Sequence, residues 1–210
     1  MSASSSGPYV LSSPEQYWQL VQAQTEQELV DLASYVPGLV LDIRYATSHN
    51  VLGKPMYSKP LAYARRPVAE ALAEVQQELQ TRGLGLCVYD AYRPYSVTVR
   101  LFEHIQDENF AAPPSRGSHH NRGCSVDVGL VELATGCHLP MPTDFDELGP
   151  PAHARYSQLP GHIILNRCLL LASMCRHGFV NYPGEWWHFD YHSWDAYDLL
   201  DLSFENLTSK

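Results

Sequence analysis

The chain has 210 residues, of which 45% are hydrophobic and 18% charged, a composition typical of a globular protein that buries a sizeable core. Its net charge of -9 argues against nucleic acid or an anionic membrane as the main partner. The N-terminus is small and polar, so we expect no secretory signal, no membrane span and a cytoplasmic location. Five cysteines without a Cys-x-x-Cys pair favour reduced thiols over disulfides or a thiolate zinc site.

The first half of the chain predicts alternating helices and strands. Residues 1–12 are expected to form a flexible tail, and Ser13-Pro14-Glu15 has the capping residue, the proline and the acid that begin a helix, here ending near Ala23. The clearest helix is expected at 67–82, where apolar residues recur at helical spacing before Gly83. The other expected elements are strands at 29–32, 39–45 and 86–89 and a helix at 94–105.

The second half predicts a hairpin, a long helix and two closing strands. These elements are expected at 124–139, 163–177, 179–182 and 187–191, with a loop-rich segment at 141–162. The segment after Trp194 is acidic and ends polar. Because no repeat or linker divides the chain, residues 13–210 are expected to form a single α+β domain.

One aromatic stretch, Tyr182 to Tyr191, contains a Glu-x-x-His pair formed by Glu185 and His188. Burying a carboxylate and an imidazole among aromatic residues is costly unless both are satisfied. A metal ion would satisfy them, with His188 as a ligand and Glu185 beside a metal-bound water. A helix surface pair is the alternative for the motif taken alone.

A second concentration of ligand-type side chains lies at 115–127, where His119, His120 and Asp127 occur among Gly and Ser residues. One His and the Asp from this stretch would join His188 in a set of two imidazoles and one carboxylate. Catalytic zinc commonly takes three protein ligands of these types. A solvated His-His pair and a turn aspartate are the alternatives for each residue alone.

A third candidate is Arg93, within Asp90-Ala91-Tyr92-Arg93-Pro94. It closely follows an expected strand and precedes a proline, which restricts its backbone. Its guanidinium could point into a cleft and bind an oxyanion or a carboxylate. A surface arginine, or one paired with Asp90, is the alternative.

Together these motifs resemble the D-alanyl-D-alanine dipeptidases of the vancomycin-resistance type, within a zinc-peptidase superfamily that includes D,D- and L,D-carboxypeptidases and the Hedgehog signalling domain. The pattern Ser-x-His-x-x-Gly-x-Ala-x-Asp matches Ser118, His120, Gly123 and Asp127, with Ser125 in place of Ala. The pattern selects His120 over its neighbour. The Tyr-Arg-Pro and Glu-Trp-Trp-His motifs are also present, and the likeness spans roughly 28–195.

The resemblance implies an α+β fold with a central, mainly antiparallel sheet flanked by helices and a small active-site cavity. It implies one zinc ion per chain, held by His120, Asp127 and His188. It further implies that Glu185 is the catalytic base and that Arg93 stabilises the transition state. The residues expected to hold or enclose the substrate are Ser118, Asp146, Tyr45, Trp186 and Trp187, with Asp146 paired to the substrate ammonium.

The implied reaction is hydrolysis of free D-alanyl-D-alanine, a small D,D-dipeptide, by a metal-activated water. A D,D- or L,D-carboxypeptidase acting on peptidoglycan stem peptides is the alternative among enzymes, and a non-catalytic zinc-stabilised binding domain is the alternative outside them. The sequence leaves the physiological purpose open among glycopeptide resistance, cell-wall recycling and D-alanine nutrition. It also leaves the oligomeric state open, with a homodimer as one alternative.

Overall fold

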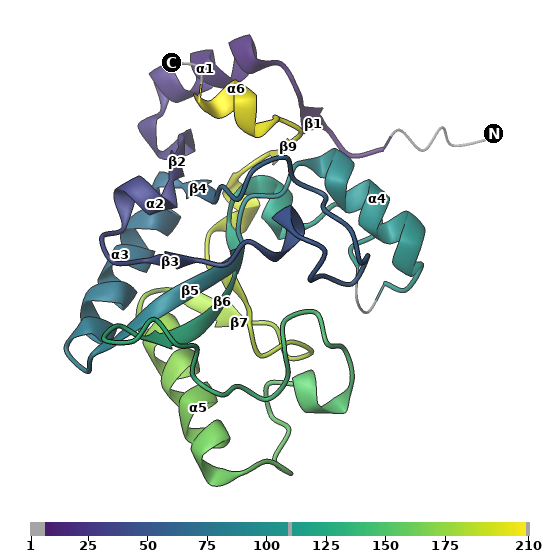
Figure 1. Cartoon of the computed structure of the whole chain (residues 1–210). Helices are drawn as coiled ribbons and strands as arrows, with labels where there is room; N and C mark the ends of the chain where they lie inside the picture. Colours follow the sequence, from purple (N-terminus) through teal and green to yellow (C-terminus); the bar gives the residue numbers. More distant parts are fainter. Residues whose placement is uncertain (1–6, 109–110, 209–210) are drawn as a thin grey trace.

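A computed structural model describes residues 7–108 and 111–208 and centres on a five-stranded sheet (Figure 1). The strands are β3 (Val40–Leu41), β5 (Leu84–Asp90), β6 (Ser125–Glu132), β8 (His188–Tyr191) and β7 (Phe179–Asn181), in that spatial order. The β3–β5 pair is parallel and the other three pairs are antiparallel, which confirms the expected mainly antiparallel sheet. The long strands β5 and β6 lie at its centre and are almost entirely buried.

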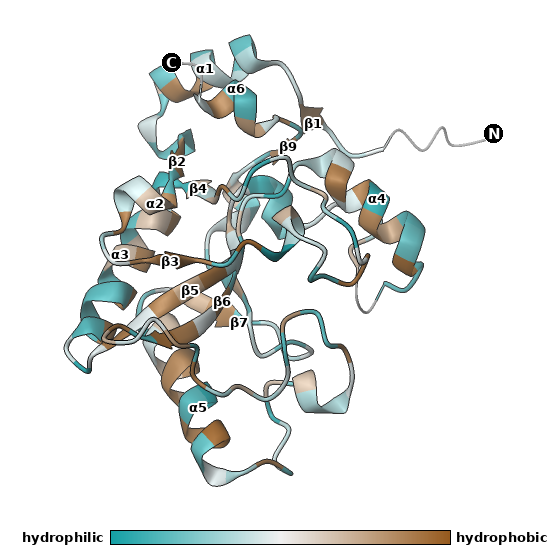
Figure 2. Cartoon of the chain, viewed as in Figure 1, coloured by the Kyte–Doolittle hydropathy of each residue, from teal (hydrophilic) through white to brown (hydrophobic). Residues whose placement is uncertain are grey.

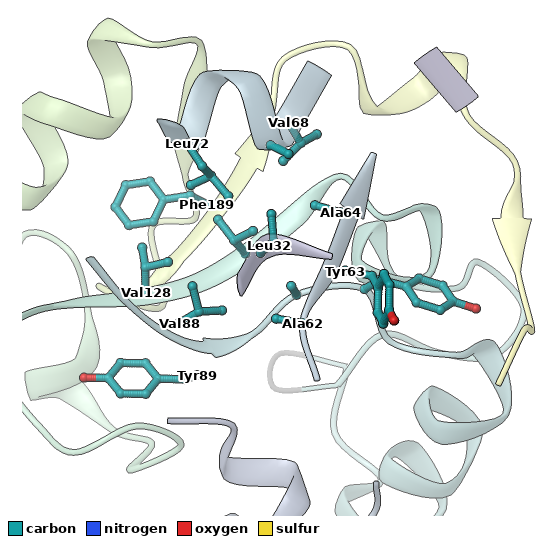
Figure 3. Close-up of a cluster of buried hydrophobic side chains, with 14 of the residues drawn as sticks. Leu32, Ala62, Tyr63, Ala64, Val68, Leu72, Val88, Tyr89, Val128 and Phe189 are labelled. Carbon is teal, nitrogen blue, oxygen red and sulfur yellow. The ribbon is translucent and has the colours of Figure 1, made fainter. Parts of the chain in front are cut away.

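Two long helices, α3 (Arg66–Gln80) and α5 (Gly161–Arg176), cover one face of this sheet. On α3 the periodic residues expected to face the core, among them Val68 and Leu72, are fully buried. Figure 3 shows Leu72 beside Phe189 over this face, while Tyr89 projects from the opposite face of the sheet. The apolar residues that recur at helical spacing in the sequence are therefore the ones buried against the sheet. Hydrophobic residues concentrate on the strands and polar residues on the outer helix surfaces (Figure 2).

Shorter elements surround this central unit. They are α1 (Pro14–Ala23), α2 (Leu32–Tyr35), α4 (Tyr95–Ile105) and α6 (Phe204–Thr208), with β2 (Leu29–Asp31) paired antiparallel to β4 (Tyr63–Arg65). The expected start of α1 is confirmed, because the Ser13 hydroxyl accepts a hydrogen bond from the backbone N–H of Gln16. Among the described residues, no helix combines the length and the hydrophobicity needed to cross a membrane.

The structure departs from expectation at both ends of the described chain. Val10–Leu11, expected within a flexible tail, forms strand β1 and pairs in parallel with β9 (Leu199–Leu200). Leu11, Leu199 and Leu200 are buried, so apolar burial fixes both segments. Residues 1–6 of the expected tail lie outside the described residues, and the domain limits stay a prediction.

Candidate active site

The register of the central strands brings Asp127 of β6 between Asp90 of β5 and His188 of β8. A 3₁₀ turn at His119–Arg122 adds His120 from outside the sheet. The Ser118 hydroxyl accepts a hydrogen bond from the backbone N–H of His120 at 3.2 Å and so caps this turn. Residues that are far apart in the sequence thus converge at one end of the sheet.

Three candidate ligands meet here with the separations that a single metal ion requires. Nε2 of His120 lies 3.2 Å from Nδ1 of His188 and 3.4 Å from Oδ2 of Asp127, and Nδ1 of His188 lies 3.0 Å from Oδ1 of Asp127. Ligand atoms around a tetrahedral zinc ion, each bound at about 2.0–2.2 Å, are separated by about 3.4 Å. The geometry therefore suits a zinc-sized divalent ion.

The outer nitrogen of each imidazole is already engaged. Nδ1 of His120 lies 2.7 Å from the carbonyl oxygen of Ala91, and Nε2 of His188 lies 3.0 Å from Oδ1 of Asp190. Because each of these nitrogens donates its hydrogen to an oxygen, the two inner nitrogens face each other with lone pairs. Burial lowers the pKa of His188, but Asp127 and Asp190 raise it well above its usual value, so without metal a proton is held between these nitrogens. A metal ion would take the place of that proton.

Asp190 is a site residue that the sequence analysis missed. Its Oδ1 also accepts a hydrogen bond from the hydroxyl of Ser125, and its Oδ2 lies 3.0 Å from Nδ1 of His119. His119 in turn stacks on Trp194, with ring centroids 3.7 Å apart. Asp190 lies two positions after His188 on the same strand, so both side chains point to the same face of the sheet. This strand period of two is the signal in the sequence that could have identified Asp190.

Arg93 lies beside the ligand cluster and is held there by Asp90. Its Nε donates to Oδ2 of Asp90 at 2.9 Å, and its Nη2 lies 3.8 Å from Oδ2 of Asp127. The guanidinium also lies over the ring of Tyr45, 5.0 Å from its centroid, while the hydroxyl of Tyr57 donates to Asp90. The pairing with Asp90 and the position in the cleft, which the sequence offered as alternatives, occur together.

Glu185 approaches the cluster from the segment before β8. Its Oε2 lies 3.9 Å from Nδ1 of His188. Burial raises the pKa of the Glu185 carboxyl to about 7, with Asp127 adding to the effect and His188 opposing it. A carboxyl group with a pKa near neutrality can both accept and return a proton.

Asp146 is the second carboxyl group in the site with a raised pKa. Burial, reinforced by the negative charge of Asp127, raises the pKa of Asp146 to about 7. The hydroxyl of Tyr45 donates to Oδ1 of Asp146 at 3.3 Å, and the backbone N–H of Val51 donates to Oδ2 at 3.3 Å. These bonds leave the carboxylate short of positive partners, so a bound cationic group would be stabilised beside it.

These side chains line a cavity of about 360 Å³, close to the lower limit of the range typical of small-molecule sites. Nine of the ten expected site residues lie on its wall: Tyr45, Arg93, Ser118, His120, Asp127, Asp146, Glu185, Trp187 and His188. Trp186 does not line it. That side chain is buried behind Trp187 and donates from Nε1 to the hydroxyl of Thr143, so the expected substrate contact becomes a core contact.

The D-ala-D-ala dipeptidase family matches residues 25–204 of the chain. A D-alanyl-D-alanine dipeptidase of Escherichia coli (strain K12) is 36% identical over 177 residues, covering 84% of this chain and 91% of that protein. Proteins of the same name from Streptomyces coelicolor and Enterococcus faecium are each 30% identical, covering 73% and 75% of this chain and 86% and 88% of theirs. The chain belongs to the D-ala-D-ala dipeptidase family and is a peptidase.

Proposed function

We propose that the protein is a zinc-dependent dipeptidase that hydrolyses free D-alanyl-D-alanine to two D-alanines. The main support for this proposal is that one small cavity contains a cluster of three candidate metal ligands, Arg93, and two carboxyl groups of raised pKa, those of Asp146 and Glu185. The relatives named D-alanyl-D-alanine dipeptidase support the same substrate.

The residues that would hold zinc are His120, Asp127 and His188, through Nε2, a carboxylate oxygen and Nδ1. When bound, zinc supplies a Lewis acid that makes water nucleophilic near neutral pH. The three ligand atoms lie within 4.8 Å of one another, which supports a single ion at this cluster.

Glu185 is the proposed general base. In its ionised form it takes a proton from the attacking water at Oε2, and it then delivers that proton to the nitrogen of the leaving D-alanine. Burial raises its pKa to about 7, which keeps its proton affinity close to that needed at neutral pH. The carboxylate is therefore suited to both halves of the proton transfer.

Arg93 is proposed to stabilise the negative charge that develops on the carbonyl oxygen of the scissile bond. Asp90 holds its Nε, which fixes the plane of the guanidinium before substrate arrives. Preorganised donors of this kind lower the activation barrier because they need no reorientation during the reaction.

Asp146 is proposed to bind the free ammonium of the dipeptide, and Tyr45, Ser118 and Trp187 to enclose the rest of the substrate. An ammonium group would compensate the buried carboxylate of Asp146, whereas an acylated amine would leave it unpaired. The small cavity favours a dipeptide over a longer chain.

A substrate panel on the zinc-loaded enzyme tests the proposal. D-Ala-D-Ala should be cleaved, whereas the L,D and L,L dipeptides, N-acetyl-D-Ala-D-Ala and a stem pentapeptide should be poor substrates. Efficient cleavage of the acetylated dipeptide or of the pentapeptide would support the carboxypeptidase alternative. Glu185→Gln should bind zinc and lose hydrolysis, and full activity in that variant would exclude the proposed base. A wild type without any peptidase activity would support a binding domain.

A further inference from the structure

A second group of metal-ligating side chains, separate from the cavity, lies on the face of the sheet opposite α3. It comprises Asp42, directly after β3, Cys87 within β5, and His138, which forms a bridge with Val131 of β6. We infer that Asp42, Cys87 and His138 form a second binding site for a divalent transition metal. This inference does not rest on the proposed function, because none of the three residues lines the catalytic cavity.

The spacing of the ligand atoms is close to that of a tetrahedral zinc site. Nε2 of His138 lies 4.0 Å from Sγ of Cys87 and 3.8 Å from Oδ2 of Asp42. Around a zinc ion bound to one sulfur, one nitrogen and one oxygen, these separations are about 3.6 Å and about 3.4 Å. Both separations are therefore within a few tenths of an ångström of those around a zinc ion, and all three ligand atoms lie within 4.8 Å of one another.

The backbone fixes the positions of two of the ligands. Cys87 lies in the register between Val40 of β3 and Gly129 of β6, so its side chain is carried by the most extensively paired strand. The backbone N–H of Asp42 donates to the carbonyl oxygen of Val88 at 2.9 Å, which extends the β3–β5 pairing by one residue. A site on such elements is held more firmly than one on loops alone.

Tyr89 orients the third ligand. Its ring stacks on the imidazole of His138 at an interplanar angle of 18°, and its hydroxyl lies 3.4 Å from Nδ1. This contact leaves Nε2 of His138 directed toward Cys87 and Asp42. An outer partner on one imidazole nitrogen, with the other facing the ion, is the usual arrangement of a metal-binding histidine.

Charge and access are also compatible with a bound cation. Arg44 donates from Nε to Oδ2 of Asp42 at 2.7 Å, but a carboxylate has about four acceptor positions and can bind a metal as well. The side chains of His138 and Asp42 are 41% and 33% exposed, so an ion can reach them from solvent. Cys87 is fully buried beneath them and would be the inner ligand.

One sulfur, one nitrogen and one oxygen ligand select borderline metals such as Zn²⁺ or Co²⁺ over Mg²⁺ or Ca²⁺. Without metal the Cys87 thiol is protonated, because burial, aided by the charge of Asp42, raises its pKa to about 12. A bound ion therefore takes the place of that proton and leaves one ligand position for water.

Cobalt substitution tests this inference directly, because the catalytic cluster contains no sulfur ligand. Titrating the full chain with Co²⁺ should reveal two equivalents and a sulfur-to-cobalt charge-transfer absorption in the near ultraviolet. Cys87→Ser should lose that absorption and one equivalent while retaining peptidase activity. His138→Asn should also lose the absorption. Because His138 is partly exposed, this variant tests the site even if the buried Cys87→Ser substitution disturbs folding.

Two controls locate the sulfur ligand, and one separates this inference from the proposed function. Cys137→Ser, exposed beside His138, and Cys124→Ser, buried elsewhere, should retain the absorption. Asp127→Asn should lose activity and one equivalent of cobalt but keep the absorption. A single equivalent in the wild type, no charge-transfer absorption, or loss of it in Cys137→Ser but not in Cys87→Ser would overturn the second site.

Discussion

The carboxylate of Asp190 accepts a hydrogen bond from Nε2 of His188 at 3.0 Å, and thereby determines that His188 presents Nδ1 to the pocket. The same oxygen accepts from the hydroxyl of Ser125 at 2.5 Å, so the acceptor is held in place. Ser125 stands where the family motif has alanine, and its hydroxyl thus joins a network behind the ligands.

We predict that Asp190→Asn weakens zinc binding by about 10- to 100-fold, because the amide no longer fixes the tautomer of His188. Zinc affinity, measured by competition with a chelator, is the direct test, and excess zinc should restore part of the activity. The exposed Asp195→Asn is the matched control and should bind zinc normally. Unchanged affinity in Asp190→Asn would contradict the orienting role.

Arg93→Lys should lower kcat by about 100- to 1000-fold with little change in KM, because the interaction is made mainly in the transition state. Lysine keeps the charge but cannot keep the hydrogen bond from Nε to Asp90 while also reaching the substrate. Steady-state kinetics on D-Ala-D-Ala measure the effect. Arg100→Lys, on the exposed side of α4, should leave both constants unchanged, and a change confined to KM in Arg93→Lys would argue for ground-state binding instead.

The parts of the fold that local chemistry specifies were predictable. The capping serine of α1 describes a contact within a few residues, and the apolar period of α3 marks the face that a helix at this position must bury. The strands β1 and β9 were not predictable, because each has two residues and forms only by pairing with a segment distant in the sequence. The five-residue helix α6 was also not predicted. Burial of Phe204 and Leu207 shows that an apparently polar ending can still pack against the core.

The candidate site likewise has features that the sequence could predict and features that it could not. The motifs identified the proposed metal ligands and the polar residues, and the structure brings them together at one cavity. The roles of Trp186 and Trp187 could not be separated in advance, because adjacent side chains point in different directions and both tryptophans are large and apolar. The rings are nearly perpendicular, and Trp187 alone of the two reaches the cavity.

The raised pKa of Asp146 predicts a pH-dependent cost to stability in the metal-free protein. Its pKa is 3.8 in the unfolded chain and about 7 in the folded protein, so the folded state holds the proton more tightly. The stability that protonated Asp146 contributes is therefore lost progressively as pH rises from 3.8 to about 7, and no further loss occurs above that pH. The loss is on the order of 4 kcal/mol for a shift of this size.

Asp146→Asn should accordingly stabilise the protein by roughly 1–2 kcal/mol at pH 5 and by about 4 kcal/mol at pH 8, in urea unfolding with a chelator present. Asp144→Asn in the same loop is the control. The Asp144 carboxylate is paired with Arg44, which lowers its pKa against the opposing effect of burial, so this variant should gain no stability at pH 8. An equal effect of Asp146→Asn at the two pH values would contradict the assigned pKa.

The backbone at Gly123, between the proposed zinc ligands His120 and Asp127, requires a glycine. It ends the 3₁₀ turn with φ of 72°, and a Cβ at this position would lie 2.4 Å from Cδ2 of Leu29. Alanine would therefore meet both a left-handed backbone and a steric clash that displaces the turn carrying His120.

We predict that Gly123→Ala destabilises the protein by about 2–4 kcal/mol, combining a left-handed backbone penalty of about 1 kcal/mol with overpacking of about 1–3 kcal/mol. Gly136→Ala is a matched control, because Gly136 has φ of 70° but no atom within 4 Å of its would-be Cβ. It should lose only the backbone contribution in urea unfolding. Zinc affinity of the His120/Asp127/His188 cluster should decrease in Gly123→Ala alone, since only that glycine shares the turn that carries His120. Equal losses of stability and of zinc affinity in the two variants would show that the contact with Leu29 does not position His120.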